Sequence, residues 1–178
     1  MCFSDASFAN LPDKGSQGGY IIFLVDDKGK YVVLAWQSKR IKRVVNSSLS
    51  AECLQAVEAA ETCILLRDRL EDILCLPNKS VQVSIIVDNK SLMDAVHTST
   101  SVENKRLQID INMLREMIEK GDISEFRWIS TAYQLANPLT KNGASTDYLL
   151  KMLWCTLRYE HSTSMFIYIV IEKKNEKM

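Results

Sequence analysis

Apolar runs of strand length alternate with longer stretches of helical spacing along this chain. Tyr20–Val25 is a continuous apolar run that suits a buried strand. The turn residues Asp26–Gly29 join it to Lys30–Trp36, so we predict a β-hairpin, with Trp36 in the core. Three more strands are predicted just before Asp5, at 81–87 and at 124–129. The pattern therefore predicts five strands.

Four segments have the apolar spacing of helices. The longest begins at the cap candidates Ser47 and Ser48 and reaches about Leu74. Its many alanines would allow close packing on a sheet. The other helices are predicted at Lys90–Val96, Lys105–Lys120 and Asp147–Tyr159. An antiparallel meander followed by β-α-β crossovers predicts an α/β fold, in which helices flank one five-stranded mixed sheet.

Three acidic residues lie at the ends of these elements. Asp5 follows the first strand, Asp88 follows the fourth, and Glu52 lies in the first turn of the long helix. Ligands gather beyond the carboxyl ends of parallel strands, so we expect these carboxylates to converge there. Carboxylates suit Mg²⁺, and pairs of divalent ions cut phosphodiesters. Each acid also has an ordinary structural interpretation when taken alone. Asp5 could be a turn residue, Glu52 an acid favoured by the helix dipole, and Asp88 a helix cap.

Composition limits the possible classes of function. A chain of 178 residues, 47% of them hydrophobic, suits one globular domain. The net charge of +0 argues against attachment to nucleic acid through a bulk positive field, so basic contacts must be local. The first residues do not form a secretory signal, and the apolar run Met165–Ile171 is too short for a helical membrane span. Five cysteines without a C-x-x-C pair predict a reduced, intracellular protein, cytoplasmic or nuclear.

Six short motifs occur in a characteristic order along the chain. They are Ser4–Ala9, Gly19–Tyr20, Trp36–Lys39, Ser47–Glu52, Val87–Ser91 and Gln134–Lys141. In this order and at this spacing, the chain resembles the ribonuclease H domain at the end of the Pol polyprotein of copia-type LTR retrotransposons. The resemblance covers roughly residues 3–155.

The resemblance implies a ribonuclease H-like domain over residues 1–158 and a C-terminal tail of unknown role over residues 159–178. That family hydrolyses the RNA strand of RNA–DNA hybrids with two Mg²⁺ ions, and Mn²⁺ is the expected substitute. Carried over, Asp5 would bridge both ions, and Glu52 and Asp88 would hold one of them. Family members have a longer first strand and are normally fused to a reverse transcriptase. We therefore expect a truncated first strand and a detached, monomeric domain.

Asn137 stands where that family has its fourth catalytic acid. An amide can offer a carbonyl oxygen to a metal, but it brings no negative charge and accepts no proton, so the second ion should bind more weakly. A structural interpretation is equally open. Asn137 followed by Pro138 suits an N-cap and the first residue of a helix.

Basic and polar residues could contact a nucleic acid. The candidates for phosphate contact are Lys39, Arg40, Lys42 and Arg43, which we call the basic patch. The family has a Lys-rich stretch there, but a solvated turn is the alternative. Asn89 and Gln134 could hydrogen-bond sugar hydroxyls, the groups that distinguish RNA from DNA.

Two functions from different classes follow. The first is a metal-dependent endonuclease that hydrolyses the RNA strand of RNA–DNA hybrids and is weakened by Asn137. The second is a non-catalytic ribonuclease H-like remnant that binds nucleic acid or a protein partner. Hybrid cleavage distinguishes the two.

Overall fold

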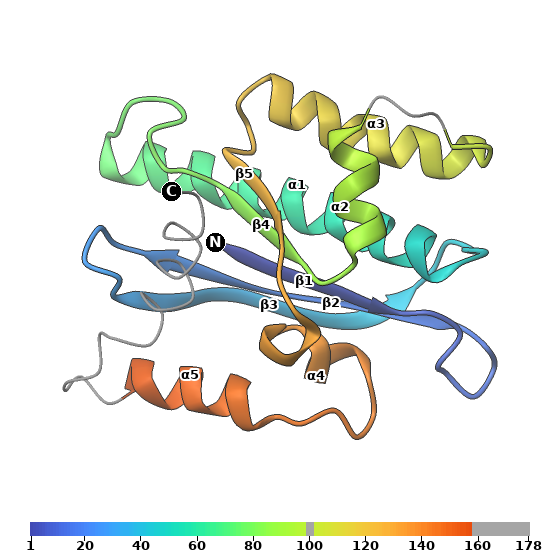
Figure 1. Cartoon of the computed structure of the whole chain (residues 1–178). Coiled ribbons are helices and arrows are strands. Elements are labelled where there is room, and N and C mark those ends of the chain that lie inside the picture. Colours follow the sequence, from blue (N-terminus) through green and yellow to red (C-terminus); the bar gives the residue numbers. More distant parts are fainter. Residues whose placement is uncertain (99–101, 158–178) are drawn as a thin grey trace, which may run out of the picture.

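The computed structural model describes residues 1–98 and 102–157 and contains one five-stranded mixed sheet (Figure 1). The strands are β1 (Cys2–Ser7), β2 (Ser16–Val25), β3 (Tyr31–Ile41), β4 (Ser84–Val87) and β5 (Glu125–Trp128). The helices are α1 (Ser48–Leu74), α2 (Lys90–His97), α3 (Lys105–Glu119), α4 (Asn137–Thr140) and α5 (Asp147–Leu157), with a 3₁₀ turn at Thr131–Tyr133. The predicted α/β architecture is confirmed, whereas residues 158–178, including the predicted tail, lie outside the described residues.

The strand order is β3-β2-β1-β4-β5. The first three strands in sequence form an antiparallel meander, and β1–β4 and β4–β5 are parallel pairs. The sheet therefore joins a hairpin region to a crossover region at β1, as the sequence pattern predicted. Strand β1 is its central element.

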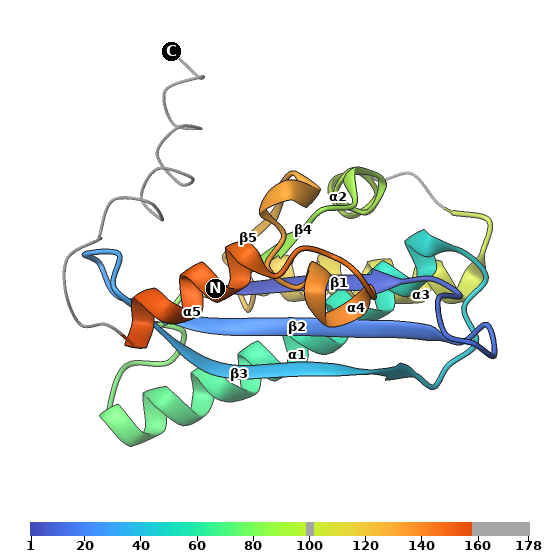
Figure 2. The same ribbon diagram turned by 90° about the horizontal axis from the view of Figure 1, so that it is seen from below.

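Alternating side chains of the strands fill two cores on opposite faces of the sheet. Cys2 and Ile85 belong to the core shared with α1, α2 and α3. Their neighbours Phe3 and Ile86 belong to the core shared with α4 and α5. This division follows the period of two in a strand. Figures 1 and 2 show α1 to α3 on one face and α4 and α5 on the other.

Helix α1 begins at one of the predicted cap residues. The Ser47 hydroxyl accepts a hydrogen bond from the backbone N–H of Ser50, which satisfies a free donor of the first turn. The residues that α1 buries completely are small: Ala51, Cys53, Ala56, Ala59 and Ala60. Because these side chains are short, the helix lies close to β1, and the residues between them can reach the sheet.

The prediction that Trp36 is a core residue is wrong, since its side chain is 70% exposed. Trp36 pairs with Ile21 across β2–β3 and so projects from the face that α4 and α5 cover. Helix α5 contacts the beginning of β3, where the Tyr31 hydroxyl donates a hydrogen bond to the Met152 carbonyl. Trp36 lies further along this edge strand, beyond that contact.

Gly19 lets α4 pack directly on β2. A Cβ at this position would lie 2.9 Å from Leu139 Cβ and 3.1 Å from Thr140 Cγ2, which is closer than ordinary contact. Gly19 is also the residue that pairs with Asp5 across β1–β2. The missing side chain at Gly19 therefore brings α4 beside Asp5.

The Gly19→Ala substitution is expected to lower the free energy of unfolding by about 1–3 kcal/mol, because α4 must shift or strain to admit the methyl group. Urea unfolding followed by circular dichroism measures this loss. Gly143→Ala is the matched control, because its φ of +78° strains alanine while its Cβ would meet no atom within 4 Å. That variant should lose about 1 kcal/mol from the backbone alone. A Gly19→Ala protein as stable as the wild type would contradict the packing described for α4.

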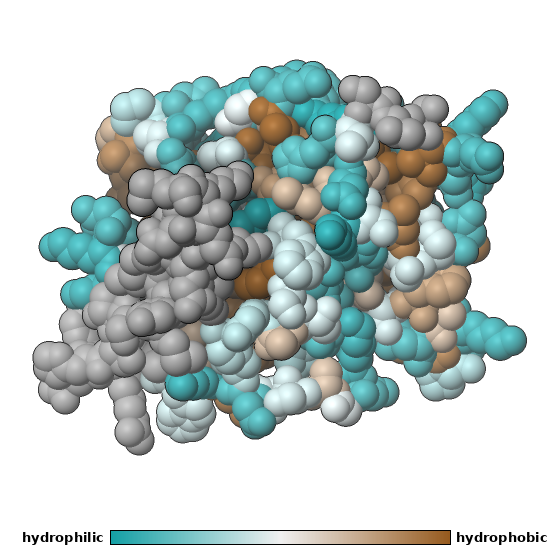
Figure 3. All heavy atoms as spheres, in the orientation of Figure 1, coloured by the Kyte–Doolittle hydropathy of each residue, from teal (hydrophilic) through white to brown (hydrophobic). Residues whose placement is uncertain are grey.

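The helices of the described ranges do not include one that is long and apolar enough to cross a membrane. On the face in Figure 3, hydrophobic surface occurs in separate patches among hydrophilic residues. Among the exposed hydrophobic residues of the described chain is Val44, after β3, with 84% exposure. Single exposed apolar residues are normal on a folded chain and indicate no particular partner.

Candidate metal centre

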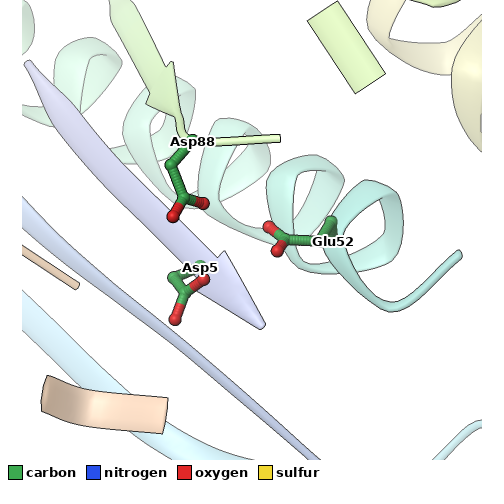
Figure 4. A group of neighbouring side chains, drawn as sticks. All are labelled: Asp5, Glu52 and Asp88. Carbon is green, nitrogen blue, oxygen red and sulfur yellow. The ribbon is translucent and has the colours of Figure 1, made fainter. Parts of the chain in front are cut away.

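Three carboxyl groups meet at one end of the sheet although their residues are far apart in the sequence. One oxygen each of Asp5, Glu52 and Asp88 lies within 4.8 Å of the others. Figure 4 shows the three side chains reaching a common space from β1, from α1 and from the end of β4. The structure thus brings together the three acids that the sequence placed at the ends of separate elements.

The parallel strands β1 and β4 separate where these acids lie. Their last pair is Phe3–Ile86, whereas β1 continues beside β2 as far as Ser7. Asp5 therefore lies within β1 and does not follow it, so the predicted position after the strand is wrong. Asp88 comes directly after β4. The two strands are not paired beyond Phe3–Ile86, and ligands bind beyond the carboxyl ends of parallel strands.

Glu52 comes from the second turn of α1. The helix begins at Ser48, so its first turn holds no acidic residue, and the predicted first-turn position of Glu52 is wrong. The helix dipole acts mainly within the first turn and is therefore a weak reason for an acid here. The fully buried neighbours Ala51 and Cys53 hold this part of the helix against the sheet. Close packing of α1 carries the Glu52 carboxyl group to Asp5.

Burial makes these carboxyl groups costly to ionise. Asp5 is fully buried, and Glu52 is only 7% exposed. Loss of water, followed by repulsion from Asp5 and Asp88, raises the pKa of Glu52 to about 9. Burial likewise raises the pKa of Asp5, against the opposing effects of the Thr140 hydroxyl and the Lys141 ammonium. A divalent cation would favour the ionised forms of both groups.

A buried carboxylate oxygen of the cluster lacks a hydrogen-bond partner among the described residues. Glu52 Oε2 is buried and makes no hydrogen bond within the described part of the chain. A buried polar atom left in this way costs about 1–3 kcal/mol, which coordination of a cation would offset. Three hard oxygen donors in one place match the ligand preference of Mg²⁺. The residues therefore fit a divalent ion, and Asp5, Glu52 and Asp88 would hold it.

The interpretation of Asn137 as an N-cap is wrong. Asn137 is the first residue of α4, and the cap position belongs to Ala136, which already has helical angles (φ −82°, ψ −12°) and makes no side-chain cap bond. The turn thus begins one residue earlier than predicted. Asn137 Oδ1 accepts a hydrogen bond from Lys141 Nζ at 2.6 Å. The amide oxygen is therefore occupied by an ammonium group.

Two residues that the sequence reasoning missed contact Asp5. The Thr140 hydroxyl donates to Asp5 Oδ2, and Lys141 Nζ lies 3.4 Å from Asp5 Oδ1. Both residues belong to the motif Gln134–Lys141. A helix brings positions i+3 and i+4 onto the same face as position i, so their spacing from Asn137 was the available signal.

Trp128 and Asn89 fix the chain around Asp88. Trp128 Nε1 donates to the Asp88 carbonyl at 2.8 Å, so this tryptophan positions the loop. Asn89 Oδ1 accepts from the backbone N–H of Leu92 and caps α2. The alternative interpretation of Asp88 as the cap is therefore wrong. The Asn89 amide nitrogen makes no hydrogen bond to a described residue and stays a candidate for sugar contact.

Gln134 serves the interior of the protein. It is only 4% exposed, and its amide nitrogen donates to the carbonyls of Ser4 and Ile86. Its Oε1 accepts from the Ala136 backbone N–H. These bonds link α4 to both parallel strands and use the polar atoms of Gln134. The predicted contact of Gln134 with a sugar hydroxyl does not agree with this placement, because its polar atoms are buried and already bonded.

The basic patch is largely paired with acids of the same chain. The pairs are Lys39–Glu58, Arg40–Asp13 and Arg43–Asp110. Within the described residues, Lys42 is exposed and makes no ion pair. Exposed pairs contribute about 0–1 kcal/mol, so Lys39 and Arg40 could exchange their partners for phosphates. Arg43 is less available, because it neutralises a carboxyl group that is buried.

Solved structures with the same topology are found, although two other comparisons give no match. No family model matches the chain, and no curated protein matches it. Among solved structures, LC11-RNase H1 in complex with an RNA/DNA hybrid is 16% identical, with a TM-score of 0.58 over 84% of this chain and 97% of that one. RNase H1 of Halobacterium salinarum NRC-1 is 15% identical, with a TM-score of 0.54 over 84% of this chain and 96% of that one.

A third structure is the N-terminal RNase H domain of Rv2228c from Mycobacterium tuberculosis. It is 13% identical, with a TM-score of 0.56 over 86% of this chain and 94% of that domain. Because the sequence identity is so low, the structural likeness shows the fold alone. The chain is thus an α/β protein with a carboxylate cluster at the end of its sheet. More specifically, it has the ribonuclease H-like fold.

Proposed function

We propose that this domain is a divalent-metal-dependent endonuclease that hydrolyses the RNA strand of RNA–DNA hybrids. The observation that carries the proposal is the convergence of Asp5, Glu52 and Asp88, with their oxygens within 4.8 Å, on a ribonuclease H-like sheet. Mg²⁺ is the expected ion because all the donors are carboxylate oxygens, and Mn²⁺ is the expected substitute. The motifs described above further support an origin in a copia-type retroelement.

The chain's own residues have separate tasks in this proposal. Asp5, Glu52 and Asp88 hold the metal, and Thr140 fixes the orientation of the Asp5 carboxylate through its hydroxyl. The bound ion would supply an activated water and neutralise charge on the phosphate. Asn89 is the candidate for contact with a ribose hydroxyl. Lys39, Arg40 and Lys42, the members of the basic patch that are not paired with a buried acid, would bind phosphates outside the reacting centre.

The proposal is tested with the whole chain and four labelled duplex or single-strand substrates of one sequence: RNA–DNA hybrid, double-stranded RNA, double-stranded DNA and single-stranded RNA. We expect cleavage of the RNA strand of the hybrid alone, with Mg²⁺ or Mn²⁺, and no cleavage in EDTA. A binding assay on the same hybrid accompanies it. A chain that leaves the hybrid intact with both ions is not the proposed nuclease.

A second function is favoured by one specific observation. The fourth ligand position holds a neutral amide bonded to Lys141 and no carboxylate. Loss of that charge could leave a hybrid-binding domain without catalysis. The two assays separate the functions, because such a remnant would bind the hybrid and leave it uncut with either ion.

A further inference from the structure

We propose that this site takes up one divalent ion, and that the Lys141 ammonium supplies the positive charge where a second ion would otherwise bind. The inference rests on the proposed metal-dependent function and concerns the ion count of the same site. It begins from the position of Lys141, which contacts two oxygens of the centre at once. These are Asn137 Oδ1 at 2.6 Å and Asp5 Oδ1 at 3.4 Å.

The two contacts of Lys141 are made to the two residues from which a second ion would be expected to take ligands. Asp5 is the acid expected to bridge two ions, and position 137 is the expected source of the fourth ligand. An ammonium carries three donors and one positive charge, so it can contact both oxygens where a divalent ion would otherwise bind them. The Lys141 side chain is 37% exposed, whereas Asp5 is fully buried, so the lysine closes this side of the centre from outside.

The other side of the centre remains suited to a metal. Glu52 Oε2 has no partner within the described residues, and its neighbours there are the Asp5 and Asp88 carboxyl groups. Among the described residues, the hydrogen bonds and ion pair of Lys141 go to Asp5 and Asn137, and Lys141 acts on Glu52 only through its charge, which opposes the rise of the Glu52 pKa. The centre is therefore divided into a metal side formed by three acids and an ammonium side formed by Lys141 and Asn137.

The charges agree with a single ion. The three ionised carboxylates, together with the Lys141 ammonium, have a net charge of minus two, and Asn137 adds nothing. One divalent ion makes this set neutral, whereas two would leave it with an excess of two positive charges in a largely buried place. An aspartate at position 137 would favour a second ion by adding a negative charge, and loss of the lysine would favour it further.

The number of ions is measured directly on the whole chain. Mn²⁺ titrated into the metal-free protein, in the absence of nucleic acid, is counted by isothermal titration calorimetry and examined by electron paramagnetic resonance. We expect one Mn²⁺ per chain, with the six-line spectrum of an isolated ion. Two ions per chain, or the multi-line spectrum of two coupled ions, would overturn the inference.

Variants at the ammonium side supply the second measurement. The double variant Asn137→Asp, Lys141→Met should bind two Mn²⁺ and give a coupled spectrum, whereas Lys141→Arg should keep one ion because the charge is retained. Lys151→Met, on α5, is the matched control and should behave as the wild type. If the double variant folds by circular dichroism and still binds one ion, Lys141 does not stand in for a metal. If it does not fold, the wild-type count decides.

This result is independent of cleavage. A chain that cuts hybrids but binds two coupled ions contradicts the single-ion inference and leaves the nuclease proposal intact. A chain that binds one ion and leaves hybrids uncut contradicts the nuclease proposal and supports the single-ion count.

Discussion

The Asp5→Asn variant is expected to lower the rate of hybrid cleavage by at least about 100-fold, because it removes the charge of the central carboxylate. Asp5 is fully buried and lies between Thr140 and Lys141 on one side and the other two acids on the other. Asparagine has the same shape, so the fold and the bond from Thr140 should persist. Loss of activity would then report on chemistry and not on unfolding.

The measurement is the initial rate of cleavage with Mg²⁺, accompanied by the affinity for Mn²⁺ and by the melting temperature. Both the rate and the affinity should fall, while the melting temperature should stay the same or rise. Asp94→Asn is the matched control, because this exposed aspartate on α2 lies outside the carboxylate cluster. Equal cleavage by wild type and Asp5→Asn would exclude the carboxylate cluster as the catalytic centre.

The sequence was sufficient to predict the sheet and the three acids that meet at its edge. Apolar runs and turn residues determine where strands such as β2 and β3 lie, because their period and punctuation are local properties. The convergence of Asp5 with Asp88 follows from topology, since parallel strands bring their carboxyl ends to one edge. These features needed no knowledge of individual contacts.

The contacts of α4 could not be predicted in the same way. Whether Asn137 caps its helix or faces the site depends on where a four-residue turn starts, and Ala136 moves that start by one residue. The place of Lys141 depends on how closely α4 approaches β2, which Gly19 decides from a distant part of the chain. Gln134 is a similar case, because its burial depends on three backbone partners in other segments.

The Glu52→Gln variant is expected to be more stable than the wild type in the absence of metal. In the folded protein, burial followed by repulsion from the other two acids raises the pKa of Glu52 to about 9, whereas in the unfolded chain it stays near 4.5. At a pH between these two pKa values, the Glu52 carboxyl group is ionised in the unfolded chain but still protonated in the folded protein. The free energy of unfolding therefore falls as the pH rises through this range. At about 1.4 kcal/mol per pKa unit, the loss at pH 7 is roughly 3 kcal/mol.

Glutamine does not ionise, so it removes this loss. Thermal unfolding in EDTA from pH 4 to pH 9 should show no advantage of Glu52→Gln at pH 4. At pH 7 we expect a gain of roughly 5–10 °C, and the gain should grow up to pH 9. Added Mg²⁺ should stabilise the wild type at pH 7 and leave the variant almost unchanged, because the ion needs the carboxylate. A pH-independent difference between the two proteins would contradict a raised pKa.

Glu71→Gln in the same helix is the matched control with the opposite sign. Glu71 is also buried, at 4% exposure, but hydrogen bonds from the backbone N–H groups of Val81 and Lys79 lower its pKa. The stability that it contributes is present above pH 4.5 and is lost as the pH falls through its lowered pKa. Glu71→Gln should therefore destabilise the protein at pH 7, with a smaller effect in acid. Two buried glutamates of α1 would then have opposite effects, because hydrogen bonds satisfy the Glu71 carboxylate, whereas Glu52 Oε2 has no partner among the described residues.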